Sequence, residues 1–219
     1  MKKIVIIYSI FIILVLYLLE QILLTPYIIK TIIKIPIFTL FPYIIQHYFI
    51  KEKFLVKIKK SERGSVLLWA VSVFITILLI AFAVKSSINT DAISQDFTDR
   101  MMLNRKSMII AALYTIFFNS LIEEYFFRGF IFKNLLKSNL LVSAYIISSS
   151  AFAIYHVSIF KAWFSPGLML LMLMGLFIGG LIFAYFAKKE KSILAPWIIH
   201  ISADLALILF GVFELGILG

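Results

Sequence analysis

Asn119-Ser-Leu-Ile-Glu-Glu-Tyr-Phe-Phe-Arg128 places two adjacent carboxylates and an arginine inside an apolar segment that begins near Met108. The segment is long enough to cross a lipid bilayer as a helix. Ionisable side chains at bilayer depth are costly unless they are paired or face water, and they mark functional sites by default. The interpretation of the chain therefore starts from Glu123, Glu124 and Arg128.

The rest of the chain is also strongly apolar. Of its 219 residues, 63% are hydrophobic, and the mean hydropathy is +1.05. A soluble domain is nearer half apolar. The apolar runs are continuous rather than alternating, which argues against a β-barrel and for helices. We therefore expect an all-α fold, a polytopic transmembrane helix bundle of about seven spans.

The expected spans are residues 4–24, 28–50, 66–84, 107–137, 140–159, 166–187 and 193–210. Segment 28–50 contains Pro36 and Pro42, so it is expected to be kinked or partly interfacial, and whether it fully spans stays open. The polar loop 85–106 has room for an amphipathic helix. Glycines at 175, 179 and 180 allow a close approach between neighbouring helices.

Charge indicates the orientation of the chain. The net charge of +10 comes mostly from lysines between apolar runs, so it is better explained by membrane topology than by nucleic acid binding. We expect the N-terminus and the basic segments 51–63, 133–137 and 188–191 on the cytoplasmic side of a membrane, most simply a bacterial cytoplasmic membrane. The chain has no cysteine, which excludes disulfides and thiolate chemistry.

The depth of two polar groups constrains the fourth span. If its helix continues to about Lys137 and turns at Ser138-Asn139, Glu123 lies 15 residues before the turn and His156 lies 17 residues after it. At 1.5 Å per residue, both lie roughly 22–26 Å along their helices from the turn. An antiparallel hairpin then brings them level, and it places Arg128 inside the protein.

Helical spacing sorts the remaining polar groups. Glu124 and Arg128 are four residues apart and share a face, so they are expected to pair. Glu123 is rotated by about 100° and has no cation near it in the sequence. His200 and Asp204 are also four residues apart, about one turn along the last span. Each of these pairs also has a purely structural explanation, as an ion pair or as a bridge between helices.

Two kinds of chemistry suit a carboxylate and two imidazoles in a cavity of low dielectric. Glu123 can act as a general base on water, assisted by His156 and His200. Alternatively, these three side chains can bind a zinc ion that generates hydroxide. Asp204 can orient His200, complete a metal site or polarise a carbonyl. Ser148, Ser149 and Ser150 lie near His156 but form no nucleophile motif.

The order of these groups resembles a known family signature. Glu123-Glu124-x-x-x-Arg128, Phe152-x-x-x-His156 and His200-x-x-x-Asp204 are similar to the EExxxR, FxxxH and HxxxN/D motifs of the CPBP family, also called the Abi family. Its members are intramembrane proteases related to the CAAX-processing endopeptidase of prenylated proteins. The resemblance covers about residues 108–210.

The resemblance implies a helical membrane fold with a cytosol-facing cavity and peptide-bond hydrolysis near the membrane. It implies that Glu123 activates water, that His156 and His200 assist, and that Glu124 and Arg128 support the site. Because position 204 is Asp rather than Asn, orienting His200 or binding metal suits it better than an oxyanion role. The family is associated with metal-dependent and with metal-free glutamic mechanisms, so zinc stays open.

Three functions follow as hypotheses. The first is an intramembrane endopeptidase acting on membrane-associated or small secreted peptides or proteins, in which residues 1–106 are scaffold helices and loops and residues 107–219 are the catalytic core of one integrated domain. The second is a non-catalytic bacteriocin immunity or scaffold protein with the same fold. The third is a transporter that uses the buried carboxylates as a proton relay.

Overall fold

The protein was analysed as a computed structural model that describes residues 2–50, 63–102, 104–160 and 163–214. These residues form helices and their connections, with no strand among them. Seven helical stretches in this part of the chain are long and apolar enough to cross a membrane. They are Lys2–Gln21, Tyr27–Tyr48, Arg63–Ser87, Lys106–Lys137, Leu141–Phe160, Pro166–Glu190 and Leu194–Phe213. The protein is therefore an all-α, polytopic membrane helix bundle, as predicted.

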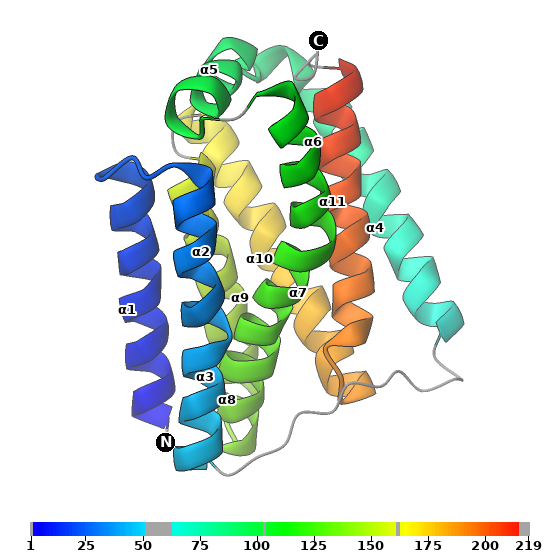
Figure 1. The fold of residues 1–219 in the computed structure, drawn as a ribbon. Coiled ribbons are helices and arrows are strands. Elements are labelled where there is room, and N and C mark those ends of the chain that lie inside the picture. The colour runs from blue at the N-terminus through cyan, green and yellow to red at the C-terminus, as the bar shows by residue number, and fades with distance from the viewer. Residues whose placement is uncertain (1, 51–62, 103, 161–162, 215–219) are drawn as a thin grey trace.

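The first two spans form a hairpin at one side of the bundle (Figure 1). Helix α1 (Lys2–Gln21) is followed by α2 (Tyr27–Phe38), α3 (Leu40–Ile45) and the π-helical turn η1 (Gln46–Ile50). Thr39, between α2 and α3, departs from helical geometry at φ −122° and ψ −65°. The second span is thus interrupted close to Pro36 and Pro42, but it is long enough to cross the membrane.

The third span is α4 (Arg63–Val84), which packs along the last helix. The 3₁₀ turn η3 (Lys85–Ser87), the short helix α5 (Thr90–Gln95) and the π-helical turn η4 (Asp96–Arg100) follow it. They lie at the end of the bundle where the chain finishes (Figure 1). Trp163 Nε1 donates a hydrogen bond of 2.7 Å to Asp96 Oδ2 and ties this cap to the connection between the fifth and sixth spans.

The fourth span is the longest, at 32 residues from Lys106 to Lys137. It consists of α6 (Arg105–Tyr114), η5 (Thr115–Asn119), α7 (Ser120–Glu124), η6 (Tyr125–Phe132) and α8 (Lys133–Lys137). The elements η5 and η6 are π-helical, so the helix widens on both sides of the two glutamates. Asn139 has a φ of 57° in the turn that follows, a conformation that asparagine tolerates.

The last three spans are α9 (Leu141–Phe160), α10 (Pro166–Glu190) and α11 (Leu194–Glu214). Helices α9 and α10 pack closely, and α1 covers another face of α9. Buried charged side chains and histidines lie in the interior formed by α2, α7, η6, α9 and α11. Large apolar side chains cover the outside. Examples are Ile7, Leu67 and Ile110, each more than 60% exposed, as expected for surfaces in contact with lipid.

Candidate functional site

The predicted site residues come together in the interior of the bundle. Glu123 and Glu124 lie on α7, Arg128 on η6, His156 on α9, and His200 and Asp204 on α11. Glu123, Glu124, Arg128, His156 and His200 are buried, with exposed fractions of 8% or less. The long fourth helix and its antiparallel partner α9 bring Glu123 and His156 to the same depth, as the hairpin prediction requires.

Glu124 and Arg128 form the predicted pair. Arg128 Nη1 donates to Glu124 Oε1 at 2.9 Å, and both side chains are fully buried. Arg128 Nη2 also donates to the carbonyl of Gly180 at 3.4 Å. The guanidinium carbon lies 4.4 Å from the centre of the Phe152 ring and 4.9 Å from that of Phe183, so aromatic faces enclose the cation.

Glu124 has a second partner that the sequence spacing did not indicate. Its Oε1 also lies 2.9 Å from His200 Nδ1. A carboxylate bound to arginine accepts hydrogen bonds, so Nδ1 of His200 carries a proton, and in the neutral ring Nε2 presents its lone pair. The Phe183 ring stacks on the His200 ring at 5.0 Å between centroids. Glu124 therefore orients His200, a role that the sequence analysis had offered to Asp204.

His156 is also held through its Nδ1 atom, in this case by a carbonyl of its own helix. Its Nδ1 lies 2.7 Å from the carbonyl oxygen of Phe152, the residue one turn earlier. A carbonyl oxygen only accepts, so Nδ1 donates and Nε2 presents its lone pair. Tyr155 and Phe152 pack against the imidazole edge to face, at 4.9 and 4.6 Å between ring centroids. The FxxxH motif thus supplies both a carbonyl and an aromatic wall.

The two imidazoles meet one oxygen of Glu123. Glu123 Oε2 lies 3.9 Å from Nε2 of His156 and 3.9 Å from Nε2 of His200. These separations are too long for direct hydrogen bonds but suit a shared polar molecule between the groups, because hydrogen bonds of ordinary length are about 2.8 Å. In the neutral rings the three atoms are all acceptors, so a water molecule can donate one hydrogen to Glu123 Oε2 and share the other between the two imidazoles.

Asp204 borders the same space. Its Oδ1 lies 3.6 Å from Nε2 of His200, on the side of the ring that faces Glu123. Its Oδ2 is buried and has no hydrogen-bond partner among the described residues. A buried acceptor without a partner is costly. Glu124, rather than Asp204, is therefore the residue whose contact fixes the tautomer of His200.

Glu123 has a cation partner that the sequence analysis missed. Lys34 Nζ, from α2, donates to Glu123 Oε1 at 2.7 Å. Asn119 Nδ2, one turn before Glu123, donates to the same oxygen at 2.8 Å. The expectation that Glu123 has no nearby cation holds along the sequence but not in space. The available signal was a lysine inside an apolar span, together with a polar residue four positions before the glutamate.

A zinc ion was the open alternative for this site. Two imidazole nitrogens and a carboxylate oxygen are suitable zinc ligands, and each Nδ1 is held by an oxygen. The spacing does not fit, because tetrahedral zinc ligands lie roughly 3.3–3.4 Å apart, against 3.9 Å from Glu123 Oε2 to each imidazole. No group of three or more His, Asp or Glu among the described residues is arranged to hold a metal ion.

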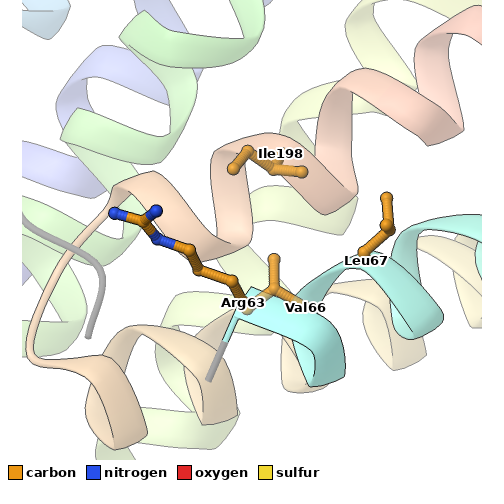
Figure 2. Close-up of a pocket in the computed structure, with 4 residues that line it drawn as sticks. All are labelled: Arg63, Val66, Leu67 and Ile198. Atoms are coloured by element: carbon orange, nitrogen blue, oxygen red, sulfur yellow. The ribbon is translucent and has the colours of Figure 1, made fainter. Parts of the chain in front are cut away.

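A surface hollow of about 270 Å³ lies elsewhere, between the start of α4 and the first turns of α11 (Figure 2). It is lined by Arg63, Val66, Leu67 and Ile198. Apart from the arginine these are apolar side chains, and none belongs to the three predicted motifs. The hollow is therefore separate from the candidate site.

Comparison with known proteins agrees with the motif resemblance. No curated protein and no solved structure matches the chain. Residues 105–206 match the family described as type II CAAX prenyl endopeptidase Rce1-like. The matched range begins with α6 and includes Glu123, Glu124, Arg128, His156, His200 and Asp204. The matched family agrees with the resemblance of the three motifs to the CPBP family.

Proposed function

We propose that the protein is an intramembrane endopeptidase in which Glu123 activates water. The observation that carries this proposal is the position of Glu123 Oε2, 3.9 Å from the Nε2 atoms of both His156 and His200. Each imidazole has its Nδ1 engaged by an acceptor, so both Nε2 lone pairs face the carboxylate oxygen. Three acceptors that converge in a buried space suit the binding and deprotonation of water.

The proposed reaction uses these groups in order. Glu123 Oε2 accepts a proton from water while the water oxygen attacks the carbonyl carbon of the scissile peptide bond. His156 and His200 accept the second hydrogen of the water as a hydrogen bond and hold its oxygen toward the substrate. The proton on Glu123 then passes to the leaving nitrogen as the C–N bond breaks, which yields a carboxylic acid and an amine.

Glu124 and Arg128 support this reaction without taking part in it. Glu124 keeps the His200 tautomer, and Arg128 neutralises the Glu124 carboxylate in a buried position. The substrates are membrane-associated or small secreted peptides or proteins, because the site lies within the spans and is surrounded by aromatic rings. The protein would lie in the cytoplasmic membrane with its N-terminus inside.

Cleavage by the purified protein tests the proposal. The assay uses the protein in liposomes with a fluorogenic peptide that ends in a CAAX sequence, offered with and without a prenyl group. We expect Glu123→Gln and His156→Ala each to reduce cleavage to the background level, because the first lacks the group that takes the proton and the second lacks a group that holds the water. Each variant should remain in the membrane.

Glu20→Gln is the matched control for Glu123→Gln. Glu20 is also buried, and its carboxylate pairs with a lysine of α2, Lys30, at 2.6 Å. This variant should cleave at a rate within about threefold of the parent protein, since it keeps every side chain of the candidate site. Equal loss of cleavage in both variants would show that the assay reports stability rather than chemistry.

Metal dependence is tested in the same assay. Elemental analysis should find no zinc bound in proportion to the purified protein, and incubation with a zinc chelator should leave cleavage unchanged. Both expectations follow because the spacing of the candidate ligands does not fit zinc. Chelation that abolishes cleavage, with zinc restoring it, would return the reaction to the metal-dependent class.

The non-catalytic and transport hypotheses predict different results. If cells keep their phenotype with Glu123→Gln and with His156→Ala, the protein acts as an immunity or scaffold protein. Proton-coupled flux in liposomes that is lost in Glu123→Gln would assign the carboxylate to transport.

A further inference from the structure

Lys34 lies in the candidate site although it comes from the second span, outside the matched range 105–206. It is 5% exposed and sits on α2, seven residues after the first residue of that helix. Its ammonium lies 5.0 Å from the centre of the Phe38 ring and 4.8 Å from that of Tyr155. Aromatic faces stabilise a buried cation, but they do not replace a counter-charge.

All the donors of this ammonium are in use. Lys34 Nζ donates to Glu123 Oε1 at 2.7 Å, to Asn119 Oδ1 at 2.5 Å and to the Tyr155 hydroxyl at 2.6 Å. An ammonium has three N–H groups, so these bonds exhaust its donors. Lys34 therefore has no hydrogen left for a substrate carbonyl, and its effect must pass through the groups it binds.

The group that matters most is Glu123. Its Oε1 accepts from Lys34 Nζ and from Asn119 Nδ2, whereas its Oε2 is the oxygen that faces both imidazoles. Two donors on one oxygen fix the rotation of the carboxylate and so decide which oxygen faces water. They also keep a charged carboxylate in the membrane interior without direct pairing to the histidines.

We propose that Lys34 is a positioning residue for Glu123, so that the second span is part of the reacting unit rather than only scaffold. This inference rests on the proposed function, because it assigns Lys34 to the reaction that Glu123 would carry out. It adds a residue from α2 to a site whose other members lie in the matched range 105–206. Lys34 binds Glu123, Asn119 and Tyr155, which lie on three different elements, and it holds them in one arrangement.

The competing explanation is a structural ion pair that only fastens α2 to the bundle. The chain provides a comparison for it, because Lys30 lies one turn earlier on α2 and pairs with buried Glu20. The two lysines lie on the same helix and carry the same charge, and each pairs with its own buried carboxylate. Lys34 donates to Glu123 of the candidate site, whereas Lys30 donates to Glu20, which is outside the three motifs.

The experiment compares Lys34→Met with Lys30→Met in the liposome cleavage assay, with kcat, KM and Tm measured for each. We expect Lys34→Met to lower kcat roughly 10²-fold with KM nearly unchanged, the size of effect expected when a reacting group is misplaced by about 1 Å. Lys30→Met should keep kcat within about threefold of the parent value, even if its Tm falls as much as that of Lys34→Met. Lys34→Gln, which keeps an N–H donor, should lose less kcat than Lys34→Met, and it supplies the readout if Lys34→Met does not fold.

Three results would overturn the inference. They are an unchanged kcat in Lys34→Met, an equal loss of kcat in the two methionine variants, and an unchanged kcat in Lys34→Gln where Lys34→Met does not fold. Failure of the proposed function is recognised separately, because it appears as normal cleavage by Glu123→Gln. If Glu123→Gln is inactive while both Lys34 variants turn over normally, the proposed function stands and only the role of Lys34 is lost.

Discussion

Asp204 has one carboxylate oxygen that no hydrogen bond from the described residues reaches. Its Oδ2 is buried without a partner among the described residues, and its Oδ1 lies 3.6 Å from His200 Nε2. Since Glu124 already holds the other nitrogen of His200, we expect Asp204 to contact the substrate of the proposed reaction. A side chain at this position that donates a hydrogen bond would stabilise the negative charge that develops on the substrate carbonyl oxygen.

Replacement of Asp204 distinguishes these roles. Asp204→Asn supplies an N–H donor of the same shape, so we expect kcat/KM to stay within about tenfold of the parent value or to rise. Asp204→Leu has no polar atom to contact the substrate, and we expect the larger loss, roughly 10²-fold in kcat. The measurement is steady-state cleavage of one peptide by the three proteins. Equal, severe losses in both variants would instead require a carboxylate at position 204.

At this scale the sequence predicts contacts within one helix better than contacts between helices. The Glu124–Arg128 pair follows from a spacing of four residues and is present in the structure. Lys34 and Glu123 are 89 positions apart, and nothing in their local patterns links them. The Glu124–His200 contact was missed because the sequence offered Asp204 as a nearer partner. Partners that depend on how helices pack need the fold itself.

At the scale of elements, the end of the fourth helix was predictable from the depth of Glu123 and His156 in the membrane. The requirement that Glu123 and His156 lie level predicted that the fourth helix continues to Lys137, and the helical stretch ends there. The π-helical turns η5 and η6 on both sides of α7 were not predicted. They rest on local backbone geometry that the period of 3.6 residues does not reveal, and such turns occur frequently at functional sites.

The contact between α9 and α10 gives a prediction about packing. A Cβ added at Gly180 would lie 2.9 Å from the Cα and Cβ of Ser149, whereas one added at Gly179 would meet nothing within 4 Å. We expect Gly180→Ala to lower the free energy of unfolding by about 1–3 kcal/mol, the usual cost of overpacking, because a backbone atom must move. Chemical unfolding in detergent measures this cost.

Gly179→Ala is the control for that substitution, since it makes the same chemical change one position earlier on the same helix. It should leave the free energy of unfolding within about 0.5 kcal/mol of the parent value. Arg128 also donates to the carbonyl of Gly180, so a shift of α10 should reduce cleavage in Gly180→Ala as well. Equal stability of the two alanine variants would show that α9 and α10 can separate slightly without cost.

At the scale of the whole molecule, charge and hydrophobicity were sufficient for the architecture but not for the site. The continuous apolar runs predicted a bundle of about seven spans, and the described residues contain seven helical stretches of sufficient length. The division into scaffold helices and a catalytic core stays a prediction, based on the position of the three motifs after residue 107. Lys34 crosses that division, because a buried carboxylate at bilayer depth needs a cation wherever the fold can supply one.

Orientation in the membrane is the remaining property of the whole molecule that the charge pattern predicts. The end of α10 carries Lys188 and Lys189, whereas α5, on the opposite side of the bundle, begins with Asp91 in its first turn (Figure 1). Basic residues next to spans favour the cytoplasmic side. We therefore expect the end of α10 inside the cell and α5 outside.

Single cysteines test this orientation cleanly, because the chain has none of its own. Asp91 and Lys188 are both exposed, so Asp91→Cys and Lys188→Cys should place a reactive thiol at opposite faces of the membrane. In intact cells a membrane-impermeant thiol reagent should label Asp91→Cys and spare Lys188→Cys. After the membrane is permeabilised, both should react to the same extent. The reverse labelling pattern would mean that the positive charges of the loops do not set the orientation, and that the N-terminus lies outside.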